Sequence, residues 1–208
     1  MDTLILPADH LDALPQALQI LRSGGLVAFP TDTVYGVGAL AFDATAIEKI
    51  YEAKGRSTEK AIPILLGDAA DLEQVTTQVS EMSLRLAGRF WPGPLTLVVP
   101  KHPSLPEAVS TSPTVGVRVP DHLVARALLR AAGPMAVTSA NLSGQASPST
   151  AQEVYAQLGG RIPLILDGGG TPGGVPSTVV NCLGAEPQVL REGPITLAQI
   201  QAVLAPRT

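Results

Sequence analysis

Three cations lie close together in the stretch YEAKGRSTEK, residues 51–60, of a chain whose formal net charge is −4. They are Lys54, Arg56 and Lys60. Lysine and arginine side chains in such a cluster could hold phosphate oxygens through charge-assisted hydrogen bonds. The same cluster could also be an ordinary solvated helix end. The rest of the sequence has to decide between these two interpretations.

Two further arginines lie in short apolar segments that read as strands. Arg118 is in VGVRV, residues 115–119, and Arg191 closes QVLR, residues 188–191. A guanidinium group in such a place needs a carboxylate or phosphate beside it, because burying an unpaired charge is costly. Each therefore has either a structural ion-pair partner or an anionic ligand. Four more arginines have the i, i+4 spacing of helices and are interpreted as solvated: Arg85, Arg89, Arg126 and Arg130.

Three loops rich in glycine and hydroxyl side chains follow short apolar segments. They are PTDTVYGVG (30–38), VTSANLSGQASPS (137–149) and DGGGTPGGVPST (167–178). Each loop alone could be a turn whose small residues serve the backbone. However, hydroxyl and amide groups offer donors and acceptors in little space, and glycine lets backbone N–H groups approach an anion. Ligands of open α/β sheets bind at loops beyond the strand ends, so one cleft could collect all three loops.

The common motifs of nucleotide binding and covalent catalysis are missing from the sequence. KGRSTEK lacks the residue order of a Walker loop, and GVGALA (36–41) carries only part of the dinucleotide-binding fingerprint. The Gly-x-Ser-x-Gly elbow of serine hydrolases does not occur. The remaining reactive side chains show no metal-ligand spacing and no evident catalytic pairing: His10, His102, His122, Cys182, Asp32, Asp43 and Asp167. Groups that hold anions without a covalent catalyst favour nucleotidyl or phosphoryl transfer.

Composition excludes several classes of protein. Hydrophobic residues make up 45% and charged residues 15% of the 208 residues, which is typical of a globular chain. The acidic balance and the 3% of aromatic residues argue against a broad nucleic-acid surface. A single cysteine rules out a disulfide framework. The N-terminus lacks the basic start of a signal peptide, and no apolar run approaches the roughly 20 residues of a membrane span. We therefore expect a cytoplasmic protein without membrane contact.

The elements that would position these residues alternate between helix and strand. Helical periodicity predicts helices over 9–23, 44–54, 80–90, from about 121, 149–158 and 196–204. Eight short apolar strands are expected, at 26–29, 62–66, 95–99, 115–119, 135–138, 163–167, 177–181 and 188–191. This alternation predicts an α/β fold with a sheet flanked by helices, in one domain over residues 1–208. The short connection between the last two strands predicts an antiparallel pair, and hence a mixed parallel and antiparallel sheet.

Taken together, these segments resemble the threonylcarbamoyl-AMP synthases of the YrdC/TsaC type, in their single-domain form. The resemblance runs from about residue 14 to residue 204 and rests on seven segments in family order. They are FPTDTVYGVG, AKGRSTEK, WPGPLTLV, VGVRVP, TSANLSGQASPS, DGGGTPGGVPSTVV and LREGP. The resemblance implies a twisted sheet with a concave cleft. It also implies the synthesis of threonylcarbamoyl-adenylate from L-threonine, bicarbonate and ATP.

The resemblance further implies roles for particular residues. Lys54 and Arg56 would be catalytic. The groups that would hold ATP are Arg56, Lys60, Thr114, Ser139, Asn141, Ser147 and Arg191. The threonine pocket would contain Thr33, Tyr35, Arg118 and Ser177. Mg²⁺ would enter with ATP, held by phosphate oxygens and water, so no protein metal site is expected.

The family's product feeds the threonylcarbamoyl modification of the adenosine beside the tRNA anticodon. Its implied partners are therefore tRNA and a downstream threonylcarbamoyl transferase complex. Ser57 stands where many relatives have proline, so the loop at 55–61 is expected to be less rigid here. Two alternatives stay open at this point: an RNA-binding module, and a synthase-like paralogue without activity.

Overall fold

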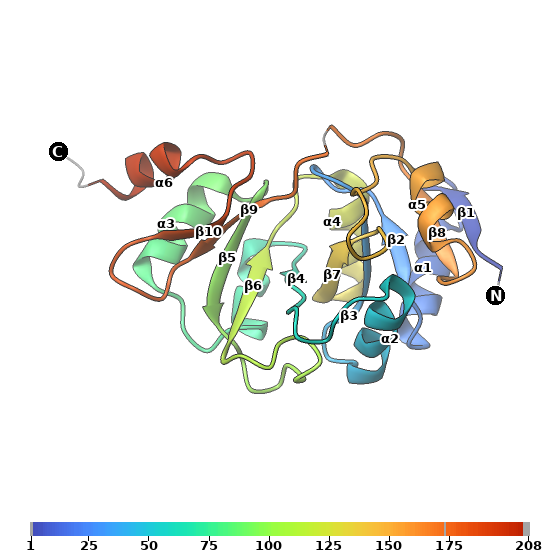
Figure 1. Ribbon diagram of the computed structural model, residues 1–208, viewed down its shortest axis with the longest axis horizontal. Coiled ribbons are helices and arrows are strands. Elements are labelled where there is room, and N and C mark those ends of the chain that lie inside the picture. Colours follow the sequence, from blue (N-terminus) through green and yellow to red (C-terminus); the bar gives the residue numbers. More distant parts are fainter. Residues whose placement is uncertain (1, 173, 206–208) are drawn as a thin grey trace.

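The computed structural model describes residues 2–172 and 174–205. The strands of the described chain are β1 Leu4–Pro7, β2 Val27–Phe29, β3 Gly36–Leu40, β4 Ile64–Leu65, β5 Leu95–Pro100, β6 Thr114–Arg118, β7 Met135–Ser139, β8 Leu164–Asp167, β9 Thr178–Asn181 and β10 Gln188–Arg191. They form one ten-stranded sheet in the order β1-β8-β2-β3-β7-β4-β6-β5-β9-β10 (Figure 1). The sheet therefore runs the whole length of the molecule, with β4 and β7 near its middle.

The sheet is mixed, as predicted. β1, β8 and β2 pair in parallel, whereas β3 runs antiparallel to both β2 and β7. β9 and β10 form the expected antiparallel pair, with a register shift between Val189 and Arg191.

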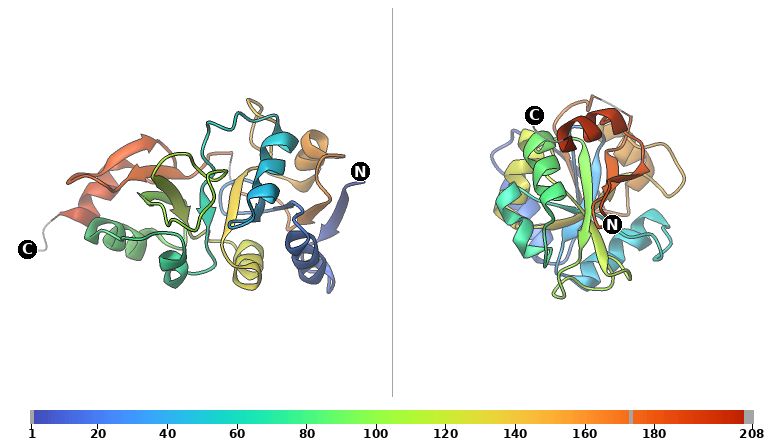
Figure 2. Two further views of the ribbon diagram at one scale, coloured as in Figure 1. Left: turned by 90° about the horizontal axis from the view of Figure 1, so that it is seen from below. Right: turned by 90° about the vertical axis from the view of Figure 1, so that its left-hand side faces the viewer.

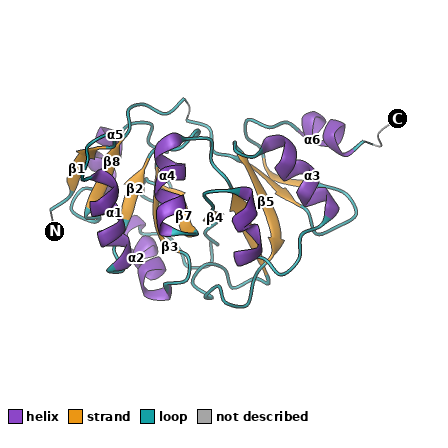
Figure 3. Cartoon of the chain, turned by 180° about the vertical axis from the view of Figure 1, so that it is seen from behind, coloured by secondary structure: helices purple, strands orange, loops and turns teal. Residues whose placement is uncertain are grey.

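Helices cover both faces of the sheet. They are α1 Ala13–Arg22, α2 Ala44–Lys54, α3 Glu81–Phe90, α4 Leu123–Ala132, α5 Ala151–Leu158 and α6 Leu197–Leu204, with a 3-10 helix at Ala69–Gln74. Figure 2 shows α1 and α4 on one side of the sheet and α2 and α5 on the other. α3 packs against α6 at the far end of the sheet (Figure 3). The predicted α/β fold is confirmed.

The first helix begins later than predicted. Its start was expected at Asp9, but α1 begins at Ala13 with Asp12 as the N-cap. Pro15 explains the difference, because proline fits only the first turn of a helix, where its missing N–H is not needed. Leu11 was predicted to lie in this helix, but it precedes α1 and is 92% exposed.

The sequence prediction missed two strands, β1 and β3. β3 lies where a polar loop, residues 30–38, was expected. Glycine weakens a strand in general, and two glycines made this segment read as a turn. In the structure a Cβ on Gly36 would lie 2.7 Å from Val137 Cγ1, and one on Gly38 would lie 2.7 Å from the Ala136 carbonyl oxygen. The glycines therefore allow β3 to approach β7 closely.

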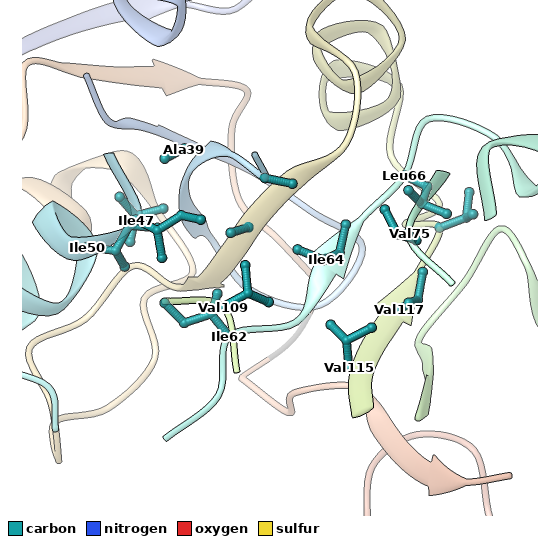
Figure 4. Close-up of a cluster of buried hydrophobic side chains, with 14 of the residues drawn as sticks. Ala39, Ile47, Ile50, Ile62, Ile64, Leu66, Val75, Val109, Val115 and Val117 are labelled. Atoms are coloured by element: carbon teal, nitrogen blue, oxygen red, sulfur yellow. The ribbon is translucent and has the colours of Figure 1, made fainter. Parts of the chain in front are cut away.

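The second helix matches its prediction at both ends. The Asp43 side chain accepts a hydrogen bond from the Ala46 N–H at 2.9 Å, which satisfies a free donor of the first turn. Gly55 ends the helix in the left-handed conformation, with φ of 58°. Its buried face, with Ile47 and Ile50, packs near Ala39 of β3 in a core that continues across the middle of the sheet (Figure 4). This packing fixes the point at which the chain leaves α2 toward Arg56.

Candidate active site

A cavity of about 330 Å³ lies over the middle of the sheet. Its walls come from β3, β4, β5, β6, β7, β9 and β10 and from the loops that join them. Gly36 and Gly116 leave part of this wall without side chains, and a Cβ on Gly116 would lie 3.0 Å from Thr96 Cγ2. The polar groups of the lining are hydroxyls and guanidinium groups: Thr31, Thr33, Thr96, Thr138, Ser139, Ser177, Arg56, Arg118 and Arg191. Among the described residues, those that line the cavity include no carboxylate.

Arg118 is held in place at the wall of this cavity. Its side chain is buried, and its Nε donates to the Gly93 carbonyl at 3.0 Å. Its Nη1 donates to Thr33 Oγ1 at 3.1 Å, and its Nη2 to Asp32 Oδ1 at 2.5 Å. Burial lowers the pKa of Arg118, and the Asp32 carboxylate opposes this shift. Asp32 is thus the carboxylate partner that was expected for Arg118. The guanidinium group keeps N–H donors that these contacts do not use, and they are free for a ligand.

Arg191 and Ser177 form a second polar cluster in the cavity. Arg191 donates from Nε and Nη2 to the Ser177 carbonyl at 3.0 and 2.8 Å, and from Nη2 to Ser177 Oγ at 3.1 Å. Ser177 Oγ also lies 2.8 Å from Thr96 Oγ1 on β5. These contacts connect the glycine-rich loop 167–178 with β5 and β10.

Arg56 reaches the cavity from the loop that follows α2. Its Nη2 donates to the Ala61 carbonyl at 3.0 Å, and its Nε to the Lys60 carbonyl at 3.3 Å. Tyr51 supports the same loop, since its hydroxyl donates to the carbonyls of Ala108 and Lys60 at 2.9 and 3.2 Å. In the structure the loop is therefore folded back on the end of α2.

Three guanidinium groups share this cavity and repel one another. Burial lowers the pKa of Arg191, and the charge of Arg56 lowers it further. The pKa of Arg118 is lowered by burial and, less strongly, by Arg191. Asp32 is the carboxylate that offsets this charge through an ion pair. An anion in the cavity would relieve the repulsion, so the electrostatics favour a carboxylate or phosphate ligand.

Lys54 does not face the cavity beside Arg56. Its side chain is 2% exposed, and its Nζ donates to the carbonyl oxygens of Ser139 and Asn141, each at 2.5 Å. Burial lowers the pKa of Lys54 to about 8, with a smaller contribution from the charge of Arg56. The lysine thus ties the end of α2 to the segment that follows β7.

Tyr35 also lies behind the cavity. Its hydroxyl donates to the Gly169 carbonyl at 2.7 Å and accepts from the Gly168 N–H at 3.2 Å. Burial raises its pKa to about 12, and Asp167 adds to the shift. Tyr35 thereby joins the start of β3 to the glycine-rich loop.

The predicted site residues fall into two groups. Those that line the cavity are Thr33, Arg56, Arg118, Ser139, Ser177 and Arg191. Those outside its lining are Tyr35, Lys54, Lys60, Thr114, Asn141 and Ser147. Asn141 donates from Nδ2 to the carbonyls of Leu142 and Gln145, and its Oδ1 is buried without a partner among the described residues. The roles assigned to both groups stay predictions.

Four polar residues of the site were not predicted: Thr31, Asp32, Thr96 and Thr138. Thr96 and Thr138 are polar residues inside apolar strands, the same signal that had identified Arg118. Asp32 had been set aside as a lone acid. Its partner Arg118 is 86 residues away in the chain, so the sequence carries no local sign of the pair.

Three of the four arginines interpreted as solvated have partners in the protein. Arg85 donates to the carbonyls of Leu204 and Ala205 at 3.1 and 2.8 Å and so joins α3 to the end of α6. Arg126 Nη2 donates to Asp68 Oδ1 at 2.6 Å, and Arg130 donates to both oxygens of Asp68 at 2.7 Å. These contacts hold the pKa of the Asp68 carboxyl well below its usual range. The ion pair is partly exposed and joins α4 to the segment after β4.

A ten-stranded mixed sheet, flanked by helices and carrying a central cavity lined by three arginines, defines an α/β protein of one particular architecture. A family model described as "Telomere recombination", for Sua5, YciO and YrdC, matches residues 19–193. The chain belongs to this family.

Particular relatives extend the comparison. A threonylcarbamoyl-AMP synthase of Bacillus subtilis is 46% identical over 93% of this chain. The structure of Pyrococcus abyssi Sua5 complexed with L-threonine superposes with a TM-score of 0.93 at 40% identity, over 97% of this chain. Escherichia coli YciO superposes with a TM-score of 0.84 at 28% identity, over 96% of this chain and 98% of that one. This chain spans 57% of the Bacillus protein and 61% of the Sua5 chain.

Within residues 2–172 and 174–205, no helix has both the length and the apolar character that are needed to cross a lipid bilayer.

Proposed function

We propose that the protein is an L-threonylcarbamoyladenylate synthase, a nucleotidyltransferase that uses L-threonine, bicarbonate and ATP and releases pyrophosphate. The observation that carries the proposal is the convergence of Arg56, Arg118 and Arg191 on one cavity whose lining has no carboxylate. All the proposed substrates carry negative charge. The Bacillus relative bears the name of this activity, and the Sua5 structure contains L-threonine.

Within the cavity, we assign neighbouring groups to different substrates. Arg118, Thr33 and Ser177 would hold threonine, with its carboxylate at the guanidinium of Arg118 and Tyr35 supporting the pocket from behind. Arg56, Arg191 and Ser139 would hold ATP, and the contact of Arg191 with Ser177 would bring the two substrates together. Four outlying predicted residues would extend the nucleotide site beyond the cavity: Lys60, Thr114, Asn141 and Ser147. Lys54 would act on catalysis by holding the carbonyls of Ser139 and Asn141 at the border of this site.

The chemistry requires no nucleophile from the protein. The threonine ammonium group first loses a proton, and the free amine condenses with bicarbonate to a carbamate with loss of water. An oxygen of the carbamate then attacks the α-phosphorus of ATP. A new P–O bond forms and the bond to the β-phosphate breaks, so pyrophosphate leaves with the electron pair. The arginines would align the reactants and neutralise the charge that develops on the phosphates. ATP would bind as its Mg²⁺ complex, and phosphate oxygens with water would coordinate the metal.

The product would enter tRNA modification in the cytoplasm. Threonylcarbamoyl-adenylate is a reactive mixed anhydride, so a transferase complex that acts on tRNA would consume it. Any direct tRNA contact of this chain would be local, because its overall charge is −4.

The direct test is to incubate the protein with ATP, Mg²⁺, bicarbonate and labelled L-threonine. We expect pyrophosphate release that requires both threonine and bicarbonate, together with label in an adenylate product. Pyrophosphate release that is independent of threonine would sink the proposal. Tight tRNA binding with steep salt dependence, in the absence of turnover, would instead favour an RNA-binding module.

Replacing Arg56 with alanine should lower kcat/KM for ATP by about 10- to 100-fold, which corresponds to the loss of one charge-assisted hydrogen bond. Steady-state pyrophosphate release at varied ATP measures this effect. Arg89→Ala is the matched control, since Arg89 lies on the exposed side of α3 over the Phe90 ring. Equal ATP kinetics for the two variants would mean that Arg56 belongs to a solvated surface.

A further inference from the structure

Asp32 lies between two cavities and uses only part of its hydrogen-bonding capacity. Its Oδ1 accepts from Arg118, which lines the central cavity. Asp32 itself lines a neighbouring cavity of about 620 Å³, and Thr33 belongs to the walls of both. Asp32 Oδ2 is buried and has no hydrogen-bond partner among the described residues, although 12% of the side chain is exposed.

The ion pair with Arg118 accounts for only one of the two oxygens of the Asp32 carboxylate, Oδ1. A carboxylate can accept several hydrogen bonds, and a buried oxygen without a donor costs free energy. His122 is near enough for Asp32 to influence its pKa, but its Nδ1 is likewise buried without a partner among the described residues. The nearby side chains therefore leave Asp32 Oδ2 unsatisfied, and a ligand with N–H donors would complete it.

An α-amino acid carries such donors at the right place. Its ammonium group and its carboxylate are attached to the same carbon, so a carboxylate bound at Arg118 brings the ammonium group next to the partner of Arg118. The lining of the central cavity offers hydroxyls and guanidinium groups but no carboxylate that could accept from an ammonium group. Asp32 is the acid in direct contact with Arg118. The Arg118–Asp32 pair thus has free N–H donors on its guanidinium group and one unpaired oxygen on its carboxylate. These groups match the carboxylate and the ammonium group of a zwitterion.

On this basis, and resting on the proposed function, we infer that Asp32 is a specificity-determining residue. It accepts hydrogen bonds from the α-ammonium group of the amino-acid substrate during binding, before this group loses the proton that carbamate formation requires it to lose. It thereby selects α-amino acids over acids of the same shape that lack the amine. Asp32 Oδ2 is buried and Asp32 does not line the central cavity, so this contact requires the carboxylate to turn toward that cavity when the amino acid binds. The terminal torsion of aspartate is broad enough for such a turn.

The test compares two ligands, L-threonine and 3-hydroxybutanoate, which has the same carbon skeleton and hydroxyl group without the amine. Calorimetric titration, with competition for the weaker ligand, gives the ratio of their dissociation constants. We expect the wild-type protein to prefer threonine by at least about tenfold, the effect of one hydrogen bond to a charged group. Asp32→Asn should reduce this preference to less than about threefold.

Two outcomes would overturn the inference. One is an unchanged preference in Asp32→Asn, with both ligands weakened equally, because Asp32 would then only position Arg118. The other is equal binding of both ligands by the wild-type protein, which requires no variant to fold. Asp121→Asn is the matched control, since Asp121 lines the same neighbouring cavity. It should change the preference by less than about twofold.

The proposed function is tested separately from this inference. If the wild-type protein shows no threonine-dependent pyrophosphate release and binds no threonine, both the proposed function and the role of Asp32 are wrong. If turnover and threonine binding are present but the amine contributes nothing, only the role of Asp32 fails.

Discussion

Arg118→Gln is expected to lower kcat/KM for threonine by about 10³-fold and the free energy of unfolding by about 3 kcal/mol. Arg118 is buried and paired with Asp32 at 2.5 Å. Glutamine removes the charge that would hold the threonine carboxylate and leaves the Asp32 carboxylate buried without its counter-ion. Breaking a buried ion pair from one side is costly for this reason. Urea unfolding measures the stability, and pyrophosphate release at varied threonine measures the kinetics.

Arg126→Gln is the matched control for this prediction. Arg126 also binds a carboxylate, that of Asp68, but the pair is partly exposed and Arg130 holds the same carboxylate. Its loss should cost less than about 1 kcal/mol and leave the threonine kinetics unchanged. If Arg118→Gln retained the wild-type KM for threonine, the carboxylate site would have to lie elsewhere in the cavity.

Much of the fold could be predicted because local signals agreed with it. The bounds of α2 were predicted from the helical spacing of its apolar residues and from Gly55 at its end, and the structure confirms both bounds, with Asp43 as an N-cap that the prediction had not used. β3 could not be predicted in the same way. Its two glycines are unfavourable for a strand in isolation, and only the close approach of Val137 on β7 shows why glycine is needed there.

The site could be predicted as a set of residue types but not as a geometry. Lys54, Arg56 and Lys60 looked like one cluster, yet the chain leaves the helix at Gly55 and their side chains have different surroundings. Arg56 lines the cavity, Lys54 is buried against backbone carbonyls, and Lys60 lies outside the cavity lining. The direction of each side chain depends on where α2 ends relative to β7, which is a tertiary fact.

Asp32 shows the opposite limit. It was considered in the sequence but set aside as a lone acid, because its partner belongs to a strand far along the chain. The ion pair exists because the loop before β3 and the end of β6 meet beside the same cavity. Residues whose function depends on such a meeting have no signature in a single sequence, whereas an arginine within an apolar strand does.

Lys54→Met is expected to reduce turnover by about 10²-fold and to change how stability depends on pH. Lys54 Nζ fixes the carbonyls of Ser139 and Asn141, which border the proposed ATP site. Methionine fills a similar volume without donors, so this segment would shift, and a displacement of about 1 Å can cost such a factor in rate. Pyrophosphate release at saturating substrates measures this loss.

The pH effect follows from the lowered pKa of Lys54, which falls from 10.5 to about 8 because the amine is buried. Below pH 8 the folded protein keeps a charge on a buried amine, so folding carries the full penalty. Between pH 8 and 10.5 the unfolded chain binds more protons than the folded one, and stability rises with pH. Between pH 8 and 10.5 the free energy of unfolding of the wild type should therefore rise by about 3 kcal/mol relative to that of Lys54→Met. Urea unfolding of both proteins at pH 7.5 and 10.5 measures this difference.

Lys49→Met, on the same helix, is the control. If the free energies of unfolding of wild type and Lys54→Met changed with pH in parallel, the amine of Lys54 would already be solvated in the folded protein.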